Sequence, residues 1–189
     1  NYSLDANTSG DLNIGLGYVS LTQNSTGSSN VGIGNSAMQL NQTGSSNTTL
    51  GNNSMKSSLS SSYNTAVGAE ALFDANRTAD TDGYNTALGY NAGNTGTNDI
   101  TTGNKNTLLG ASTAASAAAA TNQTVIGFGA SGTVNNSVTI GNSSVTAWYP
   151  GSDDTADLGS SSVEFKDLYI DGTANLDAVD IDAVSYTHL

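Results

Sequence analysis

The chain has no cysteine and almost no basic residues, histidine or proline. Its 189 residues include four Lys and Arg, one His and one Pro against 16 Asp and Glu, and the formal net charge is −12. Without cysteine there is no disulfide framework and no Cys nucleophile. With so few cations the chain offers no basic patch for phosphate groups, which argues against nucleic acid or an anionic membrane surface as a partner. No apolar run approaches the roughly 20 residues of a transmembrane helix, so we expect no membrane insertion.

These shortages leave little material for catalysis. The one histidine, His188, lies in a terminal segment that matches nothing upstream, so we expect no Ser-His-Asp or Cys-His arrangement. Asp74, Asp80 and Asp82 share one inserted segment and would be the acids of a polysaccharide-cleaving site. A solvated acidic loop is the simpler interpretation. We therefore predict that the protein is not an enzyme.

The sequence gives equally little indication of a metal site. Asp153, Asp154, Asp177, Asp180 and Asp182 would offer oxygen ligands to Ca²⁺. However, the chain has neither an EF-hand loop nor a glycine-rich calcium-binding nonapeptide repeat. We predict no cofactor, with Ca²⁺ as the one ion considered.

What the chain does have is a five-residue pattern repeated eight times, with Asn-Thr-Ala-Val-Gly at residues 64–68 as the central copy. The copies are spaced by 17, 17, 17, 21, 21, 17 and 14 residues. Each copy ends in a glycine that we expect to allow a turn: Gly17, Gly34, Gly51, Gly68, Gly89, Gly110, Gly127 and Gly141. Self-similarity at a short, nearly fixed period predicts a stacked repeat architecture rather than a disordered polar linker.

Two positions of the pattern have a constant chemical character. The second residue is always β-branched: Ile14, Val31, Thr48, Thr65, Thr86, Thr107, Thr124 and Val138. The fourth is always aliphatic: Leu16, Ile33, Leu50, Val67, Leu88, Leu109, Ile126 and Ile140. Residues two apart on a strand share a face, so each unit is expected to open with a strand. We predict that these two columns point inward and form the core ladder.

The rest of each unit predicts a second short strand of about five residues and polar loops. The residue between the two columns is small or apolar and never charged, as in Gly15, Thr49 and Ala66. If that residue faces outward, the face it forms is suited to packing against another chain, which predicts an oligomer but not the number of chains. The longer units carry their extra residues in loops, and Ala114–Ala120 is expected to be a loop or a packing seam rather than a helix.

The runs at 136–144 (Asn-Ser-Val-Thr-Ile-Gly-Asn-Ser-Ser) and 85–93 (Asn-Thr-Ala-Leu-Gly-Tyr-Asn-Ala-Gly) resemble the YadA-like head repeats of trimeric autotransporter adhesins. Bacteriophage tail fibres contain similar repeats. The resemblance covers roughly residues 10–148 and implies three chains that each form a left-handed parallel β-roll around a common axis. The chain departs from the adhesins in having long units, with no neck motif, heptad stalk or membrane anchor.

These observations predict an all-β chain in two parts. Residues 1–148 would form a left-handed parallel β-roll, or β-solenoid, of about eight coils, assembled as a homotrimer. Residues 149–189 would form a cap and a small C-terminal β module, with Trp148–Gly151 covering the last coil. Residues 157–172 resemble a short module found near the C-terminal end of tail fibres.

The function predicted is structural and adhesive. The chain would be a segment of an extracellular fibre, in a virion tail fibre or on a bacterial cell surface, that contacts a host surface or carbohydrate receptor through polar loops. One alternative is a self-assembling extracellular filament subunit glycosylated at sequons such as Asn24, Asn41 and Asn76. Another is a fibre-borne polysaccharide depolymerase. An ice-binding threonine ladder is disfavoured, because the threonines share the face predicted to point inward.

Overall fold

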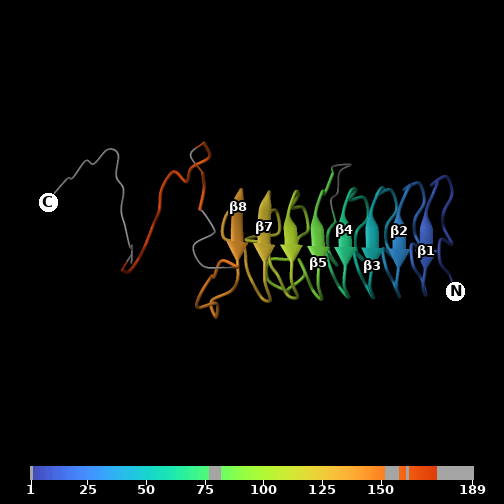
Figure 1. The fold of residues 1–189 in the computed structure, drawn as a ribbon. Coiled ribbons are helices and arrows are strands. Elements are labelled where there is room, and N and C mark those ends of the chain that lie inside the picture. Colours follow the sequence, from blue (N-terminus) through green and yellow to red (C-terminus); the bar gives the residue numbers. More distant parts are fainter. Residues whose placement is uncertain (1, 77–81, 152–157, 161, 174–189) are drawn as a thin grey trace. The chain divides into compact units, whose positions relative to one another are not determined.

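The computed structural model describes residues 2–76, 82–151, 158–160 and 162–173. Its contacts divide the chain into two units, Asn1–Thr146 and Ala147–Leu189. The described residues of the first unit form strands and turns without a helix. The eight strands are β1 (Ile14–Leu16), β2 (Val31–Ile33), β3 (Thr48–Leu50), β4 (Thr65–Val67), β5 (Thr86–Leu88), β6 (Thr107–Leu109), β7 (Gln123–Ile126) and β8 (Ser137–Ile140). They form one sheet in sequential order (Figure 1), so the predicted all-β parallel solenoid is confirmed.

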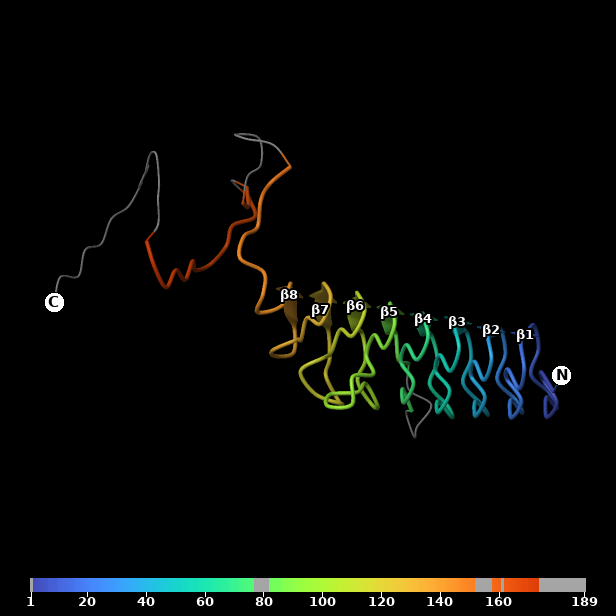
Figure 2. The ribbon, with the colours of Figure 1, turned by 90° about the horizontal axis from the view of Figure 1, so that it is seen from below.

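Successive copies of the pattern stack directly on one another. Every strand pairs in parallel with the next, and equivalent residues lie opposite each other, as Thr48 does with Thr65 and Leu50 with Val67. Backbone hydrogen bonds join the coils outside the sheet as well, for example from Leu21 N to Ala37 O at 3.0 Å. Figure 2 shows the strands along one side of the solenoid and the connecting segments on the other.

The connecting segment is not the second strand that the sequence predicted. It contains two left-handed residues separated by one, such as Ser36 (φ 53°) and Met38 (φ 49°) on either side of Ala37. The same arrangement recurs in other coils, for instance at Asn53 and Met55. Left-handed residues interrupt the extended geometry of a strand, so the chain reverses direction within a few residues while its amides still reach the next coil.

The side chains that fill the core are not the ones that the sequence predicted. The middle residue of each strand points inward, and Ala66, Ala87 and Leu108 are all completely buried. The two predicted columns point outward instead, with none of their side chains buried. The prediction of an inward core ladder is therefore wrong for the whole set: Ile14, Leu16, Val31, Ile33, Thr48, Leu50, Thr65, Val67, Thr86, Leu88, Thr107, Leu109, Thr124, Ile126, Val138 and Ile140.

The reason is the narrow interior of the coil. Large side chains enter it from the connecting segments rather than from the sheet, and four of them are completely buried: Leu21, Met38, Met55 and Leu72. The sheet then has room only for small residues. A Cβ placed on Gly32 would lie 2.9 Å from Ser20 Oγ and 3.1 Å from Leu21 Cγ. Close packing inside the coil therefore assigns the larger residues of the strands to the outside.

One coil reverses this division of volume. In the series of large side chains from the connecting segments, Gly93 takes the place of a leucine or methionine. A Cβ on Gly93 would lie 2.9 Å from both Leu108 Cδ1 and Leu72 Cδ2, and 3.6 Å from Ile100 Cγ1. Leu108 enters from the sheet side, and the longer loop of this unit supplies Ile100, which is also completely buried. The core therefore stays filled although its largest side chains come from different parts of the coil.

Leu108→Ala is expected to lower the free energy of unfolding by about 2–5 kcal/mol. The substitution leaves a cavity in the core, and Gly93, which lies against Leu108, has no side chain to fill it. Denaturant unfolding followed by circular dichroism measures this change. Leu12→Ala is the control, because Leu12 is 84% exposed, and it is expected to change stability by less than about 0.5 kcal/mol. Equal effects of the two substitutions would show that Leu108 does not fill the core.

A ladder of buried asparagines runs along the start of the strands. It connects Asn13, Asn30, Asn47, Asn64, Asn85 and Asn106 and ends at Gln123. In the case of Asn47, Oδ1 accepts hydrogen bonds from Asn64 N at 2.9 Å and Asn64 Nδ2 at 3.1 Å. Its Nδ2 donates to Asn30 Oδ1 at 3.1 Å and to Ser61 O at 2.8 Å. These amides satisfy buried polar groups where the strand meets the preceding turn, and they hold successive coils in register.

Ala114–Ala120 is a loop, as predicted, with Ala115 and Ala120 packed into the core. In the second unit, the described residues contain one antiparallel bridge, Ser160 to Val163, and no strand. Much of the predicted C-terminal β module lies outside the described residues. That module and the cap stay predictions.

Candidate interaction face

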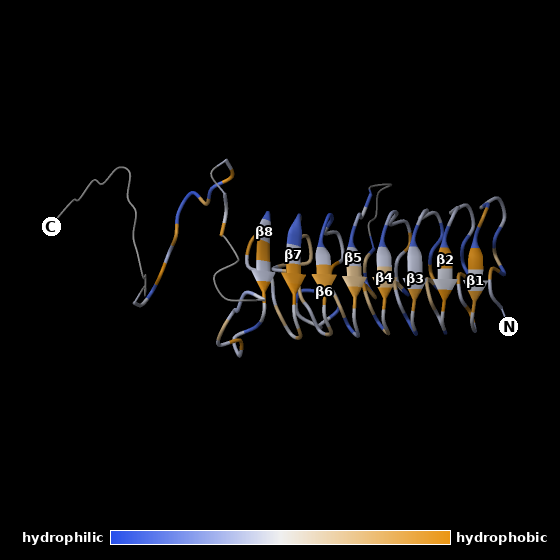
Figure 3. Ribbon diagram, in the orientation of Figure 1, coloured by the Kyte–Doolittle hydropathy of each residue, from blue (hydrophilic) through white to orange (hydrophobic). Residues whose placement is uncertain are grey.

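The outward face of the sheet is the candidate functional surface of the first unit. Its side chains stand in two columns at the strand spacing of about 4.8 Å. The aliphatic column is well exposed, with Leu16 at 61%, Leu50 at 48%, Leu88 at 46% and Leu109 at 41%. Figure 3 shows the hydrophobic residues running across successive strands. A continuous exposed apolar surface of this kind marks an interaction site in a soluble protein.

This face carries no charge of its own. None of the residues in β1 to β8 is Asp, Glu, Lys or Arg. The described acidic residues of the first unit lie outside these strands. Because charged strand residues are a common defence against association, their absence leaves this sheet face without that protection.

The β-branched column includes a threonine ladder on its four central strands. Thr48, Thr65, Thr86 and Thr107 are all exposed and lie opposite one another in register. The sequence interpretation set aside an ice-binding role because these threonines were expected to point inward. That reason no longer applies.

Stacked glycines let successive coils approach closely where the strands end. Gly51 has a φ of 149°, and a Cβ on it would overlap the carbonyl oxygen of Gly68 in the next coil. A side chain there would push the coils apart, so glycine is required by both conformation and close approach. The other predicted turn glycines also have positive φ: Gly17, Gly34, Gly68, Gly89, Gly110, Gly127 and Gly141.

The acidic residues considered for catalysis are only partly described. Asp82 accepts a hydrogen bond from the Tyr84 hydroxyl at 2.7 Å, which raises the pKa of Tyr84. Asp74 is partly buried, and Asp80 lies outside the described residues. No group of three His, Cys, Asp or Glu side chains in the described part of the chain could hold a metal ion.

The residues considered for Ca²⁺ lie outside the described part: Asp153, Asp154, Asp177, Asp180 and Asp182. The same is true of His188.

Two of the sequons are closed to modification in the folded chain. Asn24 is completely buried, and its Nδ2 donates to Asn7 Oδ1 at 2.7 Å and to Gly27 O at 2.9 Å. Asn41 is also completely buried, and its Nδ2 bonds to Asn24 Oδ1 at 2.7 Å. Asn76 is partly exposed, and other sequons, such as those of Asn52 and Asn122, have exposed asparagines. Because glycan transfer needs an accessible amide, the glycosylated-filament alternative is restricted to such positions and stays a prediction.

A column at the edge of this face was missed in the sequence. It consists of the residue that precedes each copy of the pattern, and we call it the rim column: Leu12, Ser29, Ser46, Tyr63, Tyr84, Lys105, Asn122 and Asn136. All eight side chains are exposed, and all eight residues have φ between 47° and 59°. The signal that would have found the column is its constant position in the repeat.

The fold defines the first unit as a parallel β-solenoid repeat protein with an uncharged, partly apolar strand face. Comparisons with protein-family models, with curated proteins and with solved structures found no match. Among the described residues there is no helix long and apolar enough to cross a membrane.

Proposed function

We propose that this chain is a structural and adhesive segment of an extracellular fibre, in a virion tail fibre or on a bacterial cell surface. Copies of the chain associate through the outward strand face, and the polar loops and rims contact a host surface or carbohydrate. The observation that carries the proposal is the uncharged ladder of half-exposed aliphatic side chains along β1 to β8. The fibre context comes from the resemblance of the repeats to those of adhesin heads and phage tail fibres.

Self-association is favoured because a second copy of the chain carries the same two columns of outward side chains. Each coil repeats the pair of outward side chains on its neighbour, as in Thr86-x-Leu88 and Thr107-x-Leu109. A second copy of the chain therefore presents matching apolar residues at the same spacing, and closed symmetry would cover the face in every copy. A homotrimer is proposed because the resembling repeats form trimers.

The mass and shape of the protein in solution test the proposal. Light scattering after size-exclusion chromatography is expected to give the mass of three chains of 19.0 kDa each. Negative-stain images are expected to show short rods. A monomer at micromolar concentration would overturn the association through this face. A dimer would be consistent with association through this face but would refute the homotrimer.

A second candidate function is ordering water at an ice surface. It is favoured by one observation, the four exposed threonines in register at Thr48, Thr65, Thr86 and Thr107. Each hydroxyl both donates and accepts hydrogen bonds, and the in-register sheet repeats them at the strand spacing. Thermal hysteresis measured on the purified protein separates the candidates. Ice binding needs the face free, so hysteresis in a monomeric sample would favour it over the fibre.

A further inference from the structure

We propose that the rim column holds a binding site for a neutral hexopyranose, with the ring of Tyr63 as its wall and the serines at 29 and 46 as its floor. The proposal rests on the proposed adhesive function and names the place and the ligand chemistry for it.

The wall is a pair of stacked tyrosines. The rings of Tyr63 and Tyr84 lie 5.1 Å apart between centroids with an interplanar angle of 12°. The Tyr84 hydroxyl donates to Asp82 Oδ2 at 2.7 Å. This bond and the stacking hold the pair in place although the side chains are 48% and 49% exposed. A fixed, exposed aromatic ring offers a large contact surface at low entropic cost.

The space beside the wall follows from the order of residues along the rim column. Tyr63 N donates to Ser45 O at 3.0 Å, and Ser46 N donates to Ser28 O at 2.9 Å, so consecutive rim residues belong to directly stacked coils. Tyr84 stacks on one face of the Tyr63 ring, and Ser46 and then Ser29 are the next rim residues on the side away from Tyr84. The next large side chain in that direction is Leu12, three strand spacings or about 14 Å from Tyr63. Two short, exposed side chains therefore separate two large ones, and we call the stretch over Ser29 and Ser46 the notch.

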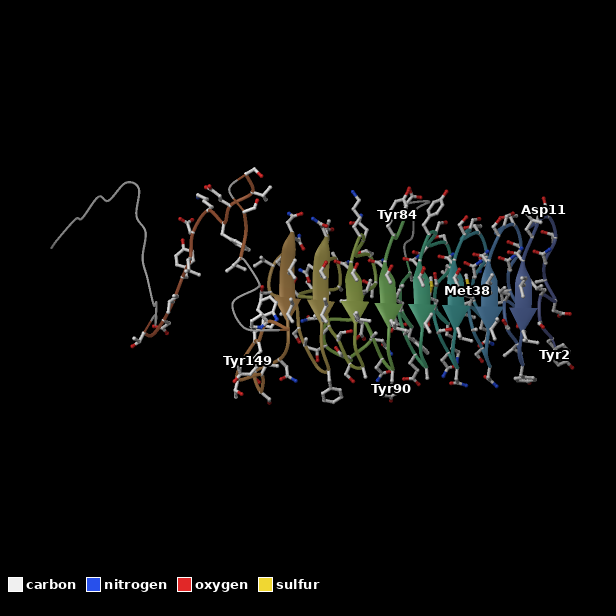
Figure 4. The ribbon with its side chains drawn as sticks, viewed as in Figure 1. Tyr2, Asp11, Met38, Tyr84, Tyr90 and Tyr149 are labelled. Atoms are coloured by element: carbon white, nitrogen blue, oxygen red, sulfur yellow. The ribbon has the colours of Figure 1, made fainter. Side chains whose placement is uncertain are left out.

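The chemistry of the notch favours a neutral sugar. The apolar face of a pyranose packs against an aromatic ring, while its hydroxyls need hydrogen-bonding partners at its edge. Ser29 and Ser46 are exposed and each carries a hydroxyl, and the backbone carbonyl of Asp11 accepts a hydrogen bond from Ser29 N at 2.8 Å, which places Asp11 at the far end of the same rim. Figure 4 shows Asp11 and Tyr84 at the rim where the strands begin, and Tyr90 at the opposite rim. Lys105, the cation of the rim column, lies in the coil beyond Tyr84, on the side away from the notch. The described residues of the rim column therefore offer a sugar carboxylate no cationic partner beside Ser29 and Ser46.

Ligand-detected and heteronuclear NMR titrations of the full chain test the site. The probes are the methyl β-pyranosides of D-glucose, D-galactose and D-mannose, with N-acetylneuraminic acid as the charged probe. At least one neutral probe is expected to bind with a dissociation constant on the order of 1–10 mM. Tyr63→Ala is expected to weaken it at least tenfold. Ser46→Leu puts a large side chain into the notch, and Leu12 shows that a leucine fits the same φ of 58°. This variant is expected to weaken sugar binding equally while the tyrosine pair stays intact.

Tyr90→Ala is the matched control, because Tyr90 is 56% exposed at the opposite rim, and it is expected to bind like the parent chain. The site is refuted if no neutral probe binds, if only the charged probe binds, or if the Tyr63 and Ser46 variants bind unchanged. The mass of the same samples is measured in parallel. If the protein assembles but binds no sugar, the sugar site is refuted and the proposed self-association stands. If the protein is a monomer that binds sugar, the self-association is refuted and the sugar site stands.

Discussion

Asn47→Asp is expected to lower the free energy of unfolding by about 3–5 kcal/mol at about pH 7. In the parent chain, Asn47 Nδ2 donates to Asn30 Oδ1 and to Ser61 O. The substitution replaces this donor with an oxygen that faces two acceptors in a completely buried position. Among the described residues neither Lys nor Arg is buried, so the introduced carboxylate meets no buried cation there. Equilibrium urea unfolding followed by circular dichroism measures the loss.

The loss is expected to shrink at about pH 3.5, below the ordinary pKa of aspartate. Burial favours the neutral acid and raises the pKa of the introduced carboxyl in the folded chain. The folded state then binds more protons than the unfolded state, so stability falls as the pH rises through the unfolded-state pKa. Asn52→Asp is the control, because Asn52 is exposed and should change stability by less than about 0.5 kcal/mol. If both variants unfold alike, the buried amide ladder does not stabilise the solenoid.

Leu88→Lys combined with Leu109→Lys is expected to convert the proposed assembly into monomers. Both side chains point outward from adjacent strands and are 46% and 41% exposed in the single chain. In a self-associated fibre they would be covered, and each uncompensated buried charge costs about 3–5 kcal/mol. Since about 1.4 kcal/mol is a factor of ten, the dissociation constant should rise at least about a hundredfold. Light scattering across a dilution series measures the change in mass.

Asn52→Lys is the control for added charge, because Asn52 is exposed and lies outside the strands. It is expected to keep the parent mass. If the double variant does not fold alone, Leu88→Ala provides a milder test, with a smaller rise in the dissociation constant and an unchanged circular dichroism spectrum. A double variant that folds and keeps the parent mass would exclude this face as the interface.

Several features of the fold could be predicted from the sequence because they depend on local chemistry. The eight strands lie within the predicted pattern, and each pairs with its equivalent in the next copy. The alternation of Thr65, Ala66 and Val67 identifies a strand with two distinct faces. The constant glycine at the end of each copy accompanies a left-handed or extended positive-φ turn, as at Gly51.

An uncharged outward strand face was predicted from the sequence, but the wrong side chains were assigned to it. This face was expected to be made of small residues such as Ala66 and Ala87. The structure buries these two residues instead and turns Leu88, which is exposed, and Val67, which is partly exposed, outward. The rim tyrosines could not be recognised as a pair from the sequence, because Tyr63 and Tyr84 are 21 residues apart and meet only through stacking of their coils.

By itself, the sequence determined the repeat period, the position of each strand and the in-register stacking, since all three follow from short-range spacing and backbone preference. Only the tertiary structure decided which face of the strands is inside. A period of two defines two faces without ranking them. The ranking came from closure of the coil. A buried asparagine ladder and the side chains of Leu21, Met38, Met55 and Leu72 take up the interior and leave β2 to β5 room only for the small residues Gly32, Thr49, Ala66 and Ala87, whereas the larger Leu108 of β6 enters where Gly93 has no side chain.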